Sequence, residues 1–149
     1  MLTKKGKYGL KALVHLAGLA PGQTAQSVEI ARANNAPKKF LDTILGELRV
    51  AGLVASRKGK NGGYMLSRAP DEIMAGDAVR VLDGPLAPIA CASRTGYLPC
   101  SDCPDVRHCS VRLLMTEVRD VSAKLLDGTS IAEMSRLAAE PVDAFMDQI

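Results

Sequence analysis

The chain has 149 residues, of which only 3% are aromatic, and its 19 Lys and Arg against 16 Asp and Glu give a net charge of +3. This length fits one domain with an added element, built around an aliphatic core. The net charge conceals a division. Residues 1–68 hold 12 basic and 3 acidic side chains, a net of +9, whereas residues 69–149 hold 7 and 13, a net of −6. A half-chain this basic predicts a polyanionic partner, which the acidic half would repel.

The N-terminal segment carries an apolar run, Ala12–Ala20, after a basic start. We do not interpret it as a signal peptide, because His15 interrupts it and its larger side chains recur at helical spacing. No segment approaches the ~18 apolar residues that a membrane span requires. The sequence therefore predicts a cytoplasmic protein without a membrane partner, in which thiols stay reduced.

The sequence predicts a first helix over residues 4–20, which stops at Pro21-Gly22. A short helix follows over Ser27–Asn34, with Thr24 or Ser27 as its N-cap. Asn35-Ala36-Pro37 forms a turn, with Pro37 in the first position of the next helix. That second helix buries one apolar face, made of Phe40, Leu41, Ile44, Leu45 and Leu48.

The exposed N-terminal face of the second helix carries polar side chains: Lys38, Lys39, Asp42 and Thr43. A short helix, a tight turn and a longer helix with such a face are typical of a helix-turn-helix. In that arrangement the second helix enters the major groove of double-stranded DNA with its N-terminal residues against base edges. A helix pair is also common in other α proteins, so the pattern is not specific by itself.

A hairpin is predicted directly after these helices, with strands over 53–58 and 64–67 joined by Gly59-Lys-Asn-Gly-Gly63, in which Asn-Gly is the turn signal. Such a hairpin is a wing. Its basic tip suits the negative potential of a narrow minor groove. The alternative is an ordinary exposed hairpin whose glycines serve only the turn. The candidate DNA contacts here are Arg57, Lys58, Lys60, Asn61, Gly62 and Tyr64.

Beyond the wing the sequence predicts a short helix around Gly76–Leu82 and a long helix over Ser110–Leu126. The long helix carries an apolar seam at intervals of three and four residues: Val111, Leu114, Val118, Val121 and Leu125. This seam either packs onto its own domain or joins a second copy, and a closed N-terminal domain favours the two-fold partner. Ser130-Ile-Ala-Glu133 is a capping box that opens a last helix, followed by an acidic tail to Ile149.

All four cysteines lie in one loop, at Cys91, Cys100, Cys103 and Cys109. Soft thiolates select zinc, copper(I) or iron–sulfur clusters. Structural zinc usually shows two close pairs of cysteines, whereas only Cys100 and Cys103 form one here. The longer gaps favour a four-cysteine iron–sulfur cluster, [4Fe–4S] or [2Fe–2S]. A zinc site or a thiol-based sensor remains the alternative, and His108 is a secondary candidate ligand.

Several motifs resemble the Rrf-two (Rrf2) family of bacterial winged-helix transcriptional regulators. They are Tyr8-Gly-Leu-Lys-Ala12, Phe40-Leu41, Ala51-Gly-Leu-Val54, Gly59-Lys-Asn-Gly-Gly-Tyr64 and Asp83-Gly-Pro-Leu86. The resemblance implies a homodimer that binds palindromic operators, with a recognition helix at about Lys38–Ala51 and a wing at Arg57–Tyr64. The family usually has Arg where this chain has Lys58, which keeps the charge but loses the planar fork.

The resemblance also bears on the cysteines. Cluster-binding members have three cysteines in this loop, and the spacing of Cys103 and Cys109 matches their last two. Some members take a fourth ligand from the partner's first helix or from a His after the last cysteine. This chain has Lys7 and Arg112 at those positions, which leaves Cys100 as the candidate replacement.

We therefore expect a mainly α protein with a small β-hairpin, organised as a winged helix-turn-helix domain (1–83), a cysteine-rich loop (84–109) and a dimerisation helix with a tail (110–149). The expected function is operator binding controlled by an iron–sulfur cluster that senses iron, redox state or nitric oxide. A zinc- or thiol-based regulator is the alternative, followed by a small redox protein using Cys100 and Cys103. No Ser/His/Asp arrangement, phosphate-binding loop or carboxylate pair predicts an enzyme.

Overall fold

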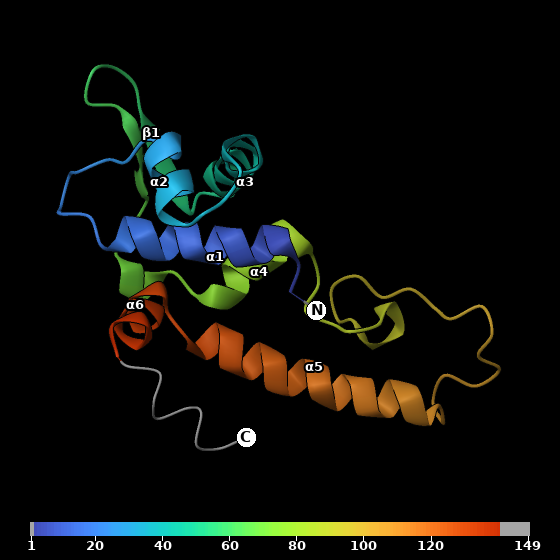
Figure 1. The fold of residues 1–149 in the computed structure, drawn as a ribbon. Coiled ribbons are helices and arrows are strands. Elements are labelled where there is room, and N and C mark those ends of the chain that lie inside the picture. Colours follow the sequence, from blue (N-terminus) through green and yellow to red (C-terminus); the bar gives the residue numbers. More distant parts are fainter. Residues whose placement is uncertain (1, 141–149) are drawn as a thin grey trace.

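The computed structural model describes residues 2–140, so the acidic tail expected after the last helix lies outside the described residues. Within this range the chain is mainly α-helical with one two-stranded hairpin, as predicted (Figure 1). No helix in this part of the chain is long and apolar enough to cross a membrane. The elements are α1 (Lys4–Ala17), α2 (Ser27–Ala33), α3 (Lys38–Val50), β1 (Val54–Arg57), β2 (Gly63–Leu66), η1 (Pro70–Glu72), α4 (Ala75–Asp83), η2 (Ala90–Ala92), α5 (Ser110–Gly128) and α6 (Ile131–Ala139).

Helix α1 lies at the centre of the core and packs against α3, α4 and α6. Its side chains Leu13 and Leu16 are buried among those of the other helices. A close approach of α4 depends on Gly9, because a Cβ added there would lie 2.0 Å from the Cδ1 atom of Leu82. Packing therefore explains Gly9 in the motif around Tyr8. The Tyr8 ring also contacts α3, since it meets the Phe40 ring edge-to-face with the ring centroids 5.9 Å apart.

The joint between α2 and α3 forms as a tight turn. Asn35 has a φ of 49°, and the Ala36 amide donates to the Ala31 carbonyl at 2.9 Å, which together end α2 with a left-handed C-terminal turn. Helix α2 begins at Ser27 as predicted, whereas its cap differs and α3 begins one residue later than predicted. Gln26, and neither Thr24 nor Ser27, caps α2, since its own amide donates to the Glu29 carboxylate at 2.6 Å. Pro37 is the N-cap of α3 and lies outside the helix.

The hairpin pairs β1 with β2 in an antiparallel register that sets Val54 opposite Leu66 and Arg57 opposite Gly63. Residues 58–62 connect the strands, so Asn-Gly does not form the two-residue turn that the sequence indicates. Asn61 lacks the positive φ which that turn requires. At the base of the wing, Gly63 has a φ of 151° and lies so close to Ala25 that a Cβ would be 2.6 Å from its carbonyl oxygen.

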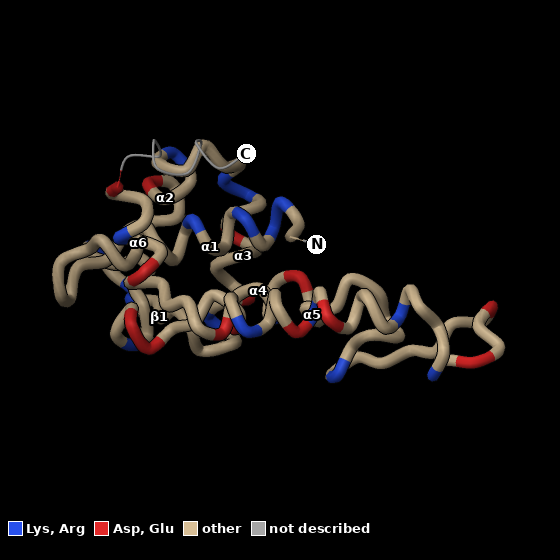
Figure 2. The backbone as a smooth tube through the Cα atoms, turned by 90° about the horizontal axis from the view of Figure 1, so that it is seen from below, with Lys and Arg blue, Asp and Glu red and all other residues tan. Residues whose placement is uncertain are grey.

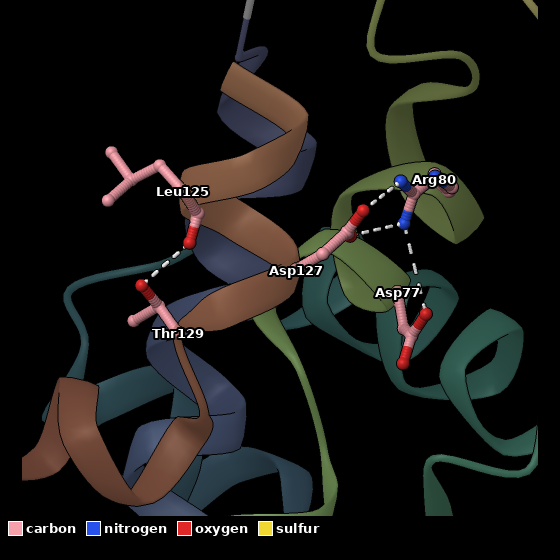
Figure 3. A network of polar contacts seen from close by, with 5 residues as sticks. All are labelled: Asp77, Arg80, Leu125, Asp127 and Thr129. Atoms are coloured by element: carbon pink, nitrogen blue, oxygen red, sulfur yellow. Dashed lines mark hydrogen bonds and ion pairs between the residues drawn. The ribbon is translucent and has the colours of Figure 1, made fainter. Parts of the chain in front are cut away.

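Helices α4 and α5 are joined by a bidentate ion pair. Arg80 donates to both carboxylate oxygens of Asp127 at 2.7 Å, and Asp77 lies at 3.9 Å from the same guanidinium (Figure 3). Helix α5 continues through Asp127 and Gly128, two residues beyond the predicted end. The Ser130 capping box is present and opens α6, which returns to the core through the fully buried Ile131.

The N-terminal part of α5 projects away from the winged-helix body, and the cysteine loop folds back beside its far end (Figure 1). Along this arm the predicted seam is exposed in the described residues. The exposed fractions are 59% for Val111, 60% for Leu114, 40% for Val118, 67% for Val121 and 68% for Leu125. The seam therefore does not pack onto its own domain, the first of the two alternatives that the sequence leaves open.

Candidate DNA-binding surface and cysteine loop

The first turn of α3 presents polar side chains while its other face is buried. Leu41, Ile44, Leu45 and Leu48 are fully buried, whereas Lys38, Lys39 and Thr43 are exposed. Lys38 lies 2.8 Å from the Asp42 carboxylate, and this hydrogen bond lowers the pKa of Asp42. The predicted contact residues of this helix therefore lie together at one solvent-facing end. Lys38 is paired with Asp42 there, and Lys39 beside it is exposed.

The wing carries its basic side chains on an exposed tip. Lys58 and Lys60 are exposed, and a hydrogen bond from Gly62 to the Gly59 carbonyl at 2.9 Å closes the tip. Arg57 is also exposed, and its guanidinium donates to the Gly22 carbonyl at 3.3 Å. The wing is further held by the Thr24 hydroxyl, which donates to the Asn61 carbonyl at 2.8 Å.

Tyr64 differs from the other predicted wing contacts. Its ring is half-buried against the core, and its backbone pairs with Ala25 at 2.8 and 3.0 Å. The side chain therefore supports the root of the wing. Two lysines of α1 also have partners inside the protein: Lys5 pairs with Glu47 at 2.6 Å, and Lys11 donates to the Asn34 carbonyl at 3.2 Å.

The basic excess of residues 1–68 falls on α1, α2, α3 and the wing. Acidic segments gather around α4, α5 and the far end of the cysteine loop, as Figure 2 shows, while Lys and Arg also mark α1 and the helices beside it. Residues 84–128 hold five basic and five acidic side chains, so the excess positive charge that attracts a polyanion lies in residues 1–68, with a net of +9.

The cysteine loop is anchored at the N-terminus of α5 by Arg112. Its guanidinium donates to the Cys91 carbonyl at 2.9 Å and to the Val106 carbonyl at 3.5 Å, and its backbone amide donates to Cys109 Sγ at 3.5 Å. Cys109 is the N-cap of α5. Arg112 therefore ties both ends of the loop to the helix, a role that no sequence pattern indicates.

Three of the four thiols have pKa values that depart from their usual range. Cys91 is buried in η2 and Cys100 is exposed, yet a hydrogen bond between these two thiols raises the pKa of Cys100. Partial burial, followed by a hydrogen bond with Cys109, raises the pKa of Cys103. The pKa of Cys109 is lowered, chiefly because the Arg112 amide donates to its sulfur. A helix N-terminus favours the deprotonated form of a thiol, and this thiolate is the form that binds a metal or acts as a nucleophile.

These residues fit a soft metal or an iron–sulfur cluster by the chemistry of their donors. Thiolates are the donors that such centres use, and metal binding requires the thiols to be deprotonated. Residues 2–140 contain no preformed group of three or more ligating side chains spaced around a metal ion. His108 is mostly exposed, and its Nδ1 lies 2.6 Å from the Asp105 carboxylate.

A helix pair with an exposed polar recognition end, followed by a basic wing, defines a winged helix-turn-helix protein of the DNA-binding regulator class. Residues 2–136 match the model of the Rrf2 family, described as an iron-dependent transcriptional regulator. The chain therefore belongs to the Rrf2 family and is a transcriptional regulator of that family.

Relatives agree over nearly the whole chain. An rrf2-like HTH-type transcriptional regulator of Rhodobacter capsulatus is 43% identical over 137 residues, which cover 90% of this chain and 91% of that protein. The solved structure of CymR, the global cysteine regulator of Bacillus subtilis, is 32% identical with a TM-score of 0.75, covering 92% of this chain and 97% of CymR. The structure of T. potens IscR is 27% identical with a TM-score of 0.72, covering 100% of this chain and 91% of IscR.

Proposed function

We propose that the chain is a homodimeric, non-enzymatic regulator whose affinity for a palindromic operator is controlled by an iron–sulfur cluster held by Cys91, Cys100, Cys103 and Cys109. The observation that carries this proposal is the Arg112 anchor, which holds the backbone of Cys91 and the thiol of Cys109 at the N-terminus of the helix with the exposed seam. The description of the family as iron-dependent supports it. A bound [4Fe–4S] or [2Fe–2S] cluster would supply a centre sensitive to iron supply, oxidants and nitric oxide.

Residues 1–83 act as the DNA-binding unit in this proposal, residues 84–109 as the sensor and 110–149 as the dimerisation segment. The side chains of Lys38, Lys39, Asp42 and Thr43 face the major groove, while Arg57, Lys58 and Lys60, with the compact Asn61-Gly62 turn, approach the minor groove. Tyr64 supports the wing from its root.

The thiols reach the dimer through α5. Cys109 caps the helix and Arg112 fastens its first turn to the loop, so a change in the ligation of the thiols alters how the loop holds this turn. In a dimer joined along α5, such a change alters the spacing of the two winged helices. Couplings of this kind are typically about 1–3 kcal/mol, which corresponds to a 5- to 150-fold change in operator affinity.

Anaerobic purification tests the cofactor. We expect a brown protein with visible absorbance and near-stoichiometric iron and sulfide. Cys103→Ala and Cys109→Ala should lose iron, sulfide and absorbance but remain folded, while Asp102→Asn in the same loop serves as a control that keeps them. Retention of the full spectrum by both cysteine variants would refute the cluster assignment.

DNA binding is tested separately with duplex DNA of random sequence at several salt concentrations. Lys39→Ala and Arg57→Ala should weaken binding, and each should lower the slope of log K against log salt by about one for every phosphate that the removed cation neutralises in the wild type. Lys124→Ala removes an exposed cation from α5 and should have no effect. Unchanged binding by the first two variants would exclude this surface.

A zinc- or thiol-based regulator of the same fold is the second candidate. The pairing of Cys91 with Cys100 and of Cys103 with Cys109 favours it, since paired thiols suit zinc or oxidation to disulfides. The similarity to CymR, described as a cysteine regulator, points the same way. A colourless protein with stoichiometric zinc, or without metal, would establish this candidate over the cluster.

A further inference from the structure

A cavity of about 260 Å³ with several charged side chains in its lining lies between α4, the segment 86–95 and α5, apart from the thiols and from the wing. Three arginines line it: Arg80, Arg94 and Arg119. Two carboxylates, Asp120 and Asp127, also line it, so the lining carries one excess positive charge. Nothing in the proposed DNA-binding or thiol chemistry uses this cavity.

Arg119 is the unusual member of the lining. It is only 6% exposed, and its Nε has no hydrogen-bond partner among residues 2–140. A buried donor without a partner costs about 1–3 kcal/mol, more when the group is charged, and a bound water, ion or ligand is one way to remove that cost. Its terminal nitrogen pairs with Asp120, which leaves the inner edge of the guanidinium unsatisfied.

The charges around Arg119 are not balanced. Arg80 has Asp127 as a bidentate partner, but Arg94 and Arg119 share the single carboxylate of Asp120, with Arg94 at 3.2 and 3.4 Å. Two guanidinium groups around one carboxylate leave donors for a second anion. The Arg94 side chain is 74% exposed and Arg119 is buried, so these groups line the solvent side and the inner side of one cavity.

The cavity lies on the side of α5 that faces its own protomer. At about 100° per residue, its lining positions 119, 120, 123 and 127 fall nearly opposite the apolar seam around Val118. A copy docked along the seam would therefore leave the cavity accessible. Because α4 supplies Arg80 and α5 supplies Arg119, an occupant would contact both the winged-helix body and the arm.

We propose that this cavity binds a small oxyanion, a molecule of amino-acid size with a carboxylate, sulfate or phosphate headgroup between Arg94 and Arg119. A volume of about 260 Å³ lies at the small end of the range for ligand pockets, which favours a small occupant. The Ser93 and Thr95 side chains and the short apolar wall of Leu86 and Ala123 suit a small body attached to that headgroup.

Thermal unfolding of the full chain tests this site independently of DNA binding and of the metal. Acetate, sulfate and phosphate are titrated at constant ionic strength against chloride. We expect at least one oxyanion to raise the midpoint saturably beyond chloride, because a ligand of the folded state stabilises it by mass action. The anion with the lowest half-saturation identifies the headgroup.

Two variants and a control locate the effect. Arg119→Gln and Arg94→Ala should raise the half-saturating concentration at least tenfold. Arg136→Ala, a 75% exposed arginine on α6, should leave it unchanged. If Arg119→Gln fails to fold, the exposed Arg94 still decides the outcome. Equal stabilisation by chloride and oxyanions, or wild-type half-saturation in Arg94→Ala, would overturn the proposal.

Discussion

The exposed seam of α5 makes a quantitative prediction about assembly. In Leu125→Asp, an apolar side chain that is 68% exposed in the protomer is replaced by a carboxylate. Fully burying a Leu side chain contributes about 1.5–3 kcal/mol, so burying the exposed two-thirds contributes about 1–2 kcal/mol. Both copies bury this side chain in a two-fold interface, so the contribution doubles to about 2–4 kcal/mol per dimer.

The expected result is a dimer dissociation constant that is about 30- to 700-fold higher than that of the wild type, because 1.4 kcal/mol corresponds to a factor of ten. Burying an unpaired carboxylate adds to this loss, so the lower figure is a minimum. Sedimentation equilibrium over a range of concentrations measures the constant, and circular dichroism verifies that the helices are retained.

Leu113→Asp is the matched control. Leu113 is also apolar and 52% exposed, but it lies about 120° around α5 from the centre of the seam. The dimer dissociation constant of this variant should lie within about threefold of the wild-type value, which corresponds to about 0.7 kcal/mol. A Leu125→Asp protein that dimerises normally, or an equal loss in both variants, would refute a two-fold interface along this face.

Three further predictions concern stability. Gly9→Val should lower the free energy of unfolding by about 1–3 kcal/mol in urea titrations, since the added atoms collide with Leu82; an unchanged midpoint would contradict the packing. Arg80→Met should cost up to about 1 kcal/mol at neutral pH. Because Arg80 lowers the pKa of Asp127, the ion pair stabilises the folded state above the unfolded-state pKa of about 4, and this stabilisation is lost as pH falls. The free energies of unfolding of wild type and variant should therefore converge in acid. A difference that stays constant with pH would argue against the pair. Ser130→Ala should cost about 0.5–2 kcal/mol, compared with no change for Ser101→Ala in the exposed loop, because it removes the hydroxyl that caps α6.

Local patterns predicted most elements within a few residues, since helix periodicity and turn residues act over short distances. The α2–α3 joint is an example, where Asn35 adopts the left-handed conformation that ends a helix. The exceptions are also local competitions. Gln26 caps α2 in place of Ser27 because Glu29 reaches back to its amide, and the wing connection is five residues long because Asn61 does not adopt the positive φ of a two-residue turn.

The candidate site divides in the same way. Spacing alone indicated the four thiols and the basic recognition residues, because ligand type and charge are properties of the residues themselves. It did not indicate Arg112 as the anchor of the loop or Arg119 as a buried cation, since both roles depend on carbonyls and carboxylates brought close by folding.

The sequence by itself therefore determined the winged helix and the family, and it located the four clustered cysteines, all of which are encoded in residue types and short spacings. Only the tertiary structure decided that α6 returns to the core at Ile131, that the seam of α5 stays exposed, and that an unbalanced pair of arginines encloses a cavity. These features join residues that are far apart in the chain, and long-range packing and charge pairing leave no periodic signal along it.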